Sequence, residues 1–209
     1  STSPTIWAWT RPILVNYWAK SGYNLGFYQG FPNRSPVGLQ KKNMDANNLL
    51  DKHYQQTEAL LDKAVKEWQN LPPQKLTQEP APGSWSAAQC LAHLNAYGNY
   101  YLPAIEKAIQ TAQAAGSKPS PEFNSSWLGA YFTKLMQPDS KTKMKSPANA
   151  IPPAFLNPAE TLAQFIDQQE RMLKLIEKAR TVNLNQVRIP ISIAQWIRLK
   201  LGDTFGFYT

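Results

Sequence analysis

The amino-acid sequence predicts an all-α protein whose core is a four-helix bundle. Apolar side chains recur at three- and four-residue steps in four separate segments, which is the spacing of one face of an amphipathic helix. No segment shows a convincing alternation of apolar and polar residues, the pattern that predicts a half-buried strand. Amphipathic helices bury their apolar faces against one another, so four of them in one chain favour a bundle.

Prolines predict where the first helix ends, and a capping pattern predicts where the second helix begins. Apolar residues at helical spacing extend over about residues 47–71, and the pair Pro72-Pro73 should end that helix. Ser86 and Gln89 have the spacing of a capping box, in which each residue bonds the backbone of the other. We therefore expect the second helix to begin at this pair and to continue to about residue 115.

The third helix follows a long, proline-rich link. This link, residues 117–156, contains one short amphipathic segment near residues 126–136 and predicts a crossover connection in place of a simple meander. Asn157 can cap the third helix and Pro158 suits its first position. That helix should end near Arg180.

A second serine–glutamine pair predicts the start of the fourth helix. Ser192 and Gln195 have capping-box spacing, and the apolar residues around and after them fit one helical face. These apolar residues are Ile193, Trp196, Ile197, Leu201, Phe205 and Tyr208. No C-cap glycine, proline or polar tail precedes Thr209, so we expect the natural helix to continue past that residue.

Residues 1–43 differ in composition from the bundle domain predicted for residues 44–209. This leader contains five basic residues and no acidic ones, and its many aromatic residues follow no period. Three interpretations remain open. The leader is a non-native stretch translated ahead of a natural start at Met44, a native extension that packs its aromatic side chains on the bundle, or a basic arm that binds an anionic surface.

Composition excludes several classes of protein. No stretch approaches the ~18 apolar residues of a membrane span, so we expect no membrane partner. The single cysteine, Cys90, rules out an intramolecular disulfide and is compatible with a reducing cytoplasm. Residues 44–209 carry 17 basic and 14 acidic side chains, a near balance that gives little reason to expect a nucleic-acid partner. The sequence shows no nucleophile motif, phosphate loop or dinucleotide fingerprint, so it identifies no catalytic residue.

The histidines and the cysteine each have a structural and a functional interpretation. His93 lies at the edge of the second helix's apolar face, beside Tyr97, where it is either a structural residue or a metal ligand. Cys90 precedes it by three residues and is better explained as a small buried thiol than as a second ligand. His53 belongs to the apolar stripe of the first helix and is expected in the core or at its boundary.

Four short motifs occur in a fixed order along the chain. They are Trp85-Ser86; Cys90-Leu91-Ala92-His93-Leu94; Lys145-Ser146-Pro147 leading through Phe155 to Pro158 and Glu160; and Arg198-Leu199-Lys200-Leu201-Gly202-Asp203-Thr204. In this order they resemble the motifs of DinB-like domains, also called YfiT-like metal-dependent hydrolases. The resemblance covers about residues 44–209.

The resemblance implies a four-helix bundle that holds a divalent metal, zinc or nickel, through three histidines. His93 corresponds to the histidine of the second helix, and the other two form a His-x-x-x-His pair that would fall just beyond Thr209. Residues four apart share a helix face, so such a pair can hold one ion. The family implies metal-dependent hydrolysis or thiol-dependent transfer on a small-molecule substrate, and a homodimer is left open.

Because only His93 corresponds to one of the family's three histidines, we expect the 209-residue chain to bind divalent ions weakly or not at all. The alternative function is a non-catalytic helical bundle used for binding or interaction.

Overall fold

The computed structural model describes residues 44–135, 146 and 150–208. The leader, residues 1–43, lies outside the described residues. The helices are α2 (Ala46–Lys66), the 3-10 helix η1 (Trp68–Asn70), α3 (Pro73–Thr77), α4 (Ala87–Ala114), α5 (Trp127–Leu135), α6 (Pro158–Ala179) and α7 (Leu201–Tyr208). The strands are β1 (Met44–Asp45), β2 (Glu122–Phe123), β3 (Arg188–Ile191) and β4 (Ala194–Lys200). None of the described helices is both long and apolar enough to cross a membrane.

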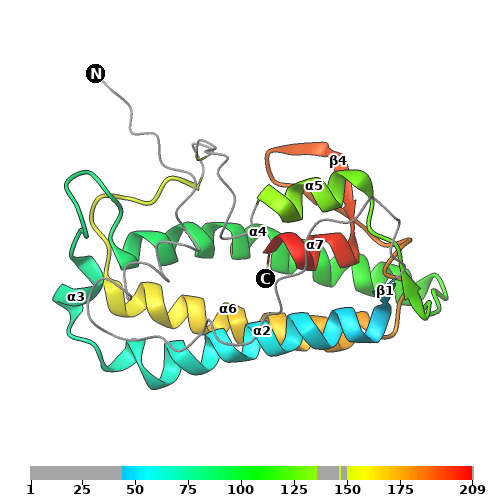
Figure 1. Ribbon diagram of the computed structural model, residues 1–209, viewed down its shortest axis with the longest axis horizontal. Helices are drawn as coiled ribbons and strands as arrows, with labels where there is room; N and C mark the ends of the chain where they lie inside the picture. The colour runs from blue at the N-terminus through cyan, green and yellow to red at the C-terminus, as the bar shows by residue number, and fades with distance from the viewer. Residues whose placement is uncertain (1–43, 136–145, 147–149, 209) are drawn as a thin grey trace, which may run out of the picture.

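Three long helices form the body of the bundle, and a short one takes the fourth position. Helix α6 packs against both α2 and α4, and α7 packs against α2 and α5 (Figure 1). The larger core cluster joins α2, α4, α6, α7 and β3 around residues such as Leu50, Ile105, Met172 and Phe205. A second cluster, around Trp68, Trp85 and Phe165, fills the end of the bundle near α3.

The predicted starts of the second and third helices are confirmed. In α4 the Ser86 hydroxyl accepts from the Gln89 backbone N–H at 3.3 Å, and Gln89 Oε1 accepts from the Ser86 N–H at 2.9 Å. In α6 the Asn157 side chain accepts from the Ala159 and Glu160 N–H groups. Each cap satisfies backbone donors that a helix start otherwise leaves without a partner.

The first helix is shorter than predicted. Helix α2 ends at Lys66, and the chain turns through η1 before α3 begins with Pro73 as its first residue. This turn places Trp68 in the core with only 3% of its surface exposed. Proline lacks an N–H and suits the first helical position, so Pro73 starts a new helix where we expected only an end.

The fourth helix begins nine residues later than its predicted cap, and the expectation of a chain without strands is wrong. Strands β3 and β4 pair antiparallel, with Ile189 opposite Leu199 and Pro190 opposite Arg198. The Ser192 N–H donates to the Tyr101 hydroxyl at 3.1 Å, so Ser192 lies in the hairpin turn and caps no helix. Helix α7 begins only at Leu201.

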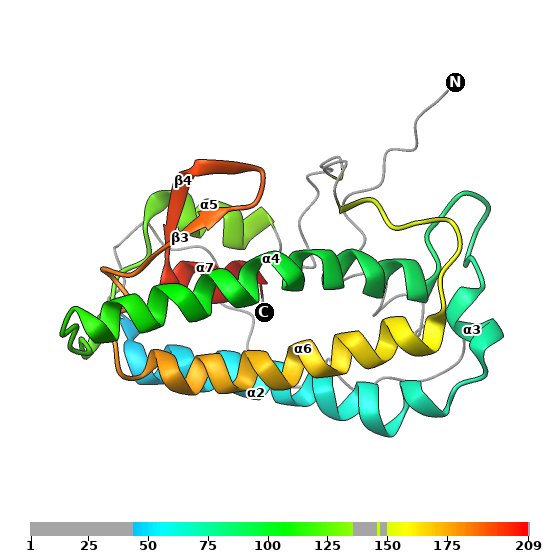
Figure 2. The same cartoon turned by 180° about the vertical axis from the view of Figure 1, so that it is seen from behind.

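Helices α4 and α6 run in the same direction, and a layer of side-chain amides lies between them. Gln168 Nε2 donates to the Asn95 carbonyl at 3.1 Å and to Asn99 Oδ1 at 2.9 Å. Asn95 Nδ2 donates to the Thr161 carbonyl at 2.8 Å, and Gln164 Nε2 to Asn99 Oδ1 at 3.1 Å. In these pairs the residue numbers increase together along both helices, as they do when two helices run parallel. The long link that carries β2 and α5 therefore returns the chain to the end of the bundle where α4 began (Figures 1 and 2).

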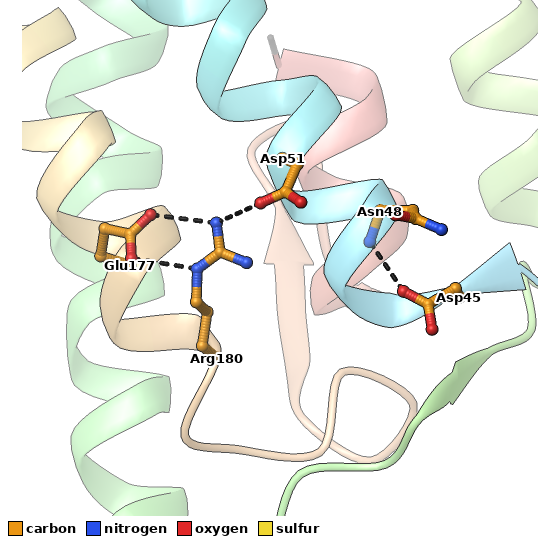
Figure 3. Close-up of polar contacts among 5 residues, drawn as sticks. All are labelled: Asp45, Asn48, Asp51, Glu177 and Arg180. Carbon is orange, nitrogen blue, oxygen red and sulfur yellow. Dashed lines mark hydrogen bonds and ion pairs between the residues drawn. The ribbon is translucent and has the colours of Figure 1, made fainter.

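Helix α2 runs opposite to α6, and an ion-pair group joins its start to the end of α6. Arg180 donates to Asp51 Oδ1 at 2.7 Å and to Glu177 Oε2 at 3.0 Å (Figure 3). In the same view the Asp45 side chain accepts from the Asn48 N–H at 2.8 Å and caps α2.

Candidate functional site

The first candidate residue, His93, lies on α4 two turns after the capping box and is 2% exposed. Its Nδ1 lies 2.6 Å from the carbonyl oxygen of Ala150 and 3.3 Å from the hydroxyl of Ser146. Both partners come from the link before α6, more than 50 residues along the chain. The link is therefore bound to α4 at the histidine.

Two aromatic rings flank the imidazole. The ring of Trp85 lies 5.1 Å away between centroids, and that of Tyr97 lies 5.0 Å away in an edge-on arrangement. Burial among these groups lowers the pKa of His93, because a charged imidazolium would lose its water; the hydrogen bond to the Ala150 carbonyl opposes this effect in part. The ring is therefore neutral near pH 7.

The hydrogen bond also determines which ring nitrogen holds the proton. A carbonyl oxygen only accepts, so Nδ1 of the neutral ring donates and Nε2 carries a lone pair. Metal-ligating histidines share this arrangement, in which a carbonyl or carboxylate fixes one nitrogen and the other binds the ion. The hydrogen bond thus favours the tautomer of His93 that is protonated at Nδ1.

The other two residues considered from the sequence do not join it. Cys90 is fully buried in the second core cluster, and desolvation raises its pKa to about 12, so it is a structural thiol as predicted. His53 is 5% exposed on α2, and its ring lies 6.3 Å from that of Phe205, which confirms a core position.

The described residues do not fit a complete metal site. Within residues 44–135, 146 and 150–208, no group of three or more His, Cys, Asp or Glu side chains is placed to hold an ion. Catalytic zinc sites use three protein ligands, so His93 is at most one member of such a set.

Sequence reasoning missed one buried acid, Asp203, which is 3% exposed at the start of α7. It accepts hydrogen bonds from the Ser126 N–H at 3.0 Å, the Ser126 hydroxyl at 2.8 Å and the Ser125 hydroxyl. Gly129 makes room for it, because an added Cβ there would lie 2.0 Å from Asp203 Cγ. The Gly-Asp-Thr motif therefore joins α7 to the start of α5, and its role is structural.

A row of aromatic rings in contact extends along α4 from His93 toward α7. His93, Tyr97 and Tyr101 follow at four-residue steps along α4, and each ring contacts the next. The ring of Tyr208, at the end of α7, lies 5.9 Å from that of Tyr101. The end of α7 thus packs about two helical turns, or ~12 Å along α4, from His93.

These features define a helical-bundle protein with a buried, hydrogen-bonded histidine on its second long helix. The chain belongs to the DinB superfamily, whose family model matches residues 50–209. A comparison with curated proteins finds no match. Among solved structures, the chain is similar to YfiT from Bacillus subtilis, described as a probable metal-dependent hydrolase with an unusual four-helix bundle topology. The two share 11% identity over 87% of this chain and 85% of that chain, with a TM-score of 0.41.

Proposed function

We propose that this protein is a metal-dependent enzyme of the DinB superfamily, a hydrolase or a thiol-dependent transferase, in which His93 is one ligand of a divalent ion. The observation that carries the proposal is the bond from His93 Nδ1 to the Ala150 carbonyl, 2.6 Å long, inside a buried site. It favours the tautomer in which the lone pair lies on Nε2, the form in which an imidazole nitrogen binds a metal. The remaining ligands would come from outside the described residues.

The surrounding residues have defined tasks in this proposal. Ser146 and the Ala150 carbonyl orient the imidazole, as second-sphere groups do for ligating histidines. Trp85 and Tyr97 flank the ring and would limit the access of water to it. The described residues do not supply a full ligand set, so the ion would need further ligands before any reaction.

A non-catalytic bundle used for binding or interaction is the second candidate. The observation that favours it is the lack of a three-ligand group among the described residues. Under this alternative, the bond from His93 to Ala150 serves only to hold the link against α4.

Calorimetric titration of metal-free protein with zinc and nickel tests the proposal. We expect weak or no binding by the 209-residue chain. A second protein should carry a helical His-x-x-x-His turn after Thr209, because α7 ends about two turns from His93 and would extend toward it. This extension should produce binding with a Kd near or below about 1 μM.

The matched variants are His93→Gln, which should abolish the new binding, and His53→Gln, which should leave it intact. Circular dichroism of both variants checks that they fold. Absence of binding in the extended protein, or binding that survives His93→Gln, would reject His93 as a ligand. If the ion binds, an added thiol and an electrophile are supplied as substrates. Consumption of the added thiol would indicate transfer, and its persistence would favour hydrolysis.

A further inference from the structure

A groove lies between the C-terminal half of α4 and the β3–β4 hairpin, away from His93. Its volume is about 680 Å³, within the range of small-molecule sites. The helix contributes alanines at helical spacing, Ala104, Ala108, Ala112 and Ala115. Pro190 of the hairpin and Val187, the residue before β3, complete the apolar lining. The side chains give the groove an apolar floor without large groups.

Three cations surround this floor. Lys107, Arg188 and Arg198 line the groove, and none of its lining residues is acidic. Within the described part of the chain, none of the three forms an ion pair, whereas Arg171 and Arg180 both do. Like charges held together repel one another, and an anion placed between them would remove that repulsion.

The hairpin register explains why the two arginines share one side. Ile189 and Leu199 lie opposite each other and are buried, so their neighbours Arg188 and Arg198 project from the other face of the hairpin. The bond from the Ser192 N–H to the Tyr101 hydroxyl attaches the hairpin turn to α4. Figure 2 shows the hairpin standing beside this part of α4. Both arginines therefore lie on one face of the hairpin, and both line the groove beside α4.

We propose that this groove binds a small organic anion, with its phosphate or carboxylate held by Arg188 and Arg198 and its apolar body lying on the alanines. Guanidinium groups offer paired donors that match the oxygens of either anion. Ala104, the lining residue nearest His93 in sequence, is eleven residues further along α4, which corresponds to about 16 Å. The groove is thus a site separate from the histidine and independent of the function proposed for it.

The test uses phenyl phosphate, inorganic phosphate and phenol as probes, titrated into the full chain and followed by calorimetry. Phenyl phosphate combines the anion with an apolar ring, while the other two probes carry one part each. We expect phenyl phosphate to bind at least about tenfold more tightly than either of the others. Its affinity should fall as salt is added, because the charges lie at an open surface.

The test variant is Arg188→Gln with Arg198→Gln, and the matched control is Lys52→Gln with Lys174→Gln. Both pairs remove two positive charges from exposed positions, but the control residues lie on α2 and α6, outside the groove. The arginine variant should lose phenyl phosphate binding by about tenfold or more, while the control should bind as the parent does. Thermal melting verifies that all the proteins fold.

Equal loss in both variants would mean that only net charge attracts the anion, and unchanged binding in the arginine variant would mean that it binds elsewhere. Inorganic phosphate binding as tightly as phenyl phosphate would remove the role of the alanine floor. Each of these results, or no phenyl phosphate binding up to about 10 mM, overturns the proposal.

Discussion

Replacing Trp85 with alanine should strongly destabilise the bundle. The indole is 8% exposed, belongs to the second core cluster and contacts the ring of His93. A tryptophan buries ~150–250 Å² on folding, which at ~25 cal/mol per Å² corresponds to ~4–6 kcal/mol as an upper estimate. Alanine retains part of that area while a cavity forms, so we expect a loss of about 3–5 kcal/mol in the free energy of unfolding.

The matched control is Trp196→Ala, the same substitution at a residue that is 84% exposed on β4. Surface substitutions usually change stability by no more than about 0.5 kcal/mol, so this variant should unfold like the parent. Urea unfolding followed by far-ultraviolet circular dichroism gives both values, provided that the slopes agree among the three proteins.

A loss below about 1 kcal/mol for Trp85→Ala would show that the ring is not packed in the core. It would also remove the aromatic wall proposed to shield His93 from water. A large loss for the exposed Trp196 would show that area burial does not explain stability in this protein.

Three further outcomes are expected. Burial raises the pKa of the Cys90 thiol to about 12, so this thiol should resist disulfide reagents at about pH 8 until the protein is unfolded in urea. Rapid labelling of the folded protein would contradict its burial. Gly129→Ala should lower the melting temperature and cost about 1–3 kcal/mol, although alanine normally favours helices, because its Cβ would lie 2.0 Å from Asp203 Cγ; a more stable variant would refute this contact. Arg180→Ala should cost at most about 1 kcal/mol in urea unfolding and less in high salt, since its bond to Asp51 is partly exposed, and a loss independent of salt would point to a packing role.

The helices that the sequence predicts well are those whose boundaries depend on neighbouring residues. Ser86 with Gln89, and Asn157 with Pro158, cap α4 and α6 as predicted, because a cap requires only side chains within three residues of the helix start. These signals require no tertiary contact.

The hairpin was missed because its residues carry two conflicting signals. Ser192 and Gln195 have capping-box spacing, but Tyr101 of a distant helix accepts the Ser192 N–H, so tertiary contact overrides the local pattern. Ile189 and Ile191 are buried while Arg188 is exposed, an alternation of period two that favoured a strand. The segment is short, and its alternation was hidden by the longer apolar series after it.

The sequence predicts only those features of the candidate site that lie within a single helix. His93 could be placed on α4 because helical spacing determines its face, but its partner Ala150 lies 57 residues away along the chain. Asp203 likewise depends on serines more than 70 residues earlier. Such pairings follow from how the link and α7 pack, which no local pattern in the sequence encodes.

The amide layer between α4 and α6 determines how far one helix can slide along the other. Apolar burial is non-directional, so it restrains the axial position of a helix less specifically than hydrogen bonds do. A displacement by one turn would leave the buried NH2 groups of Asn95 and Gln168 without their acceptors, at about 1–3 kcal/mol for each group. It would also move Gln168 away from Gly98, where an added Cβ would lie 2.0 Å from its Oε1. The amides and this glycine therefore select one axial alignment of the two helices, and with it the height at which the link meets His93.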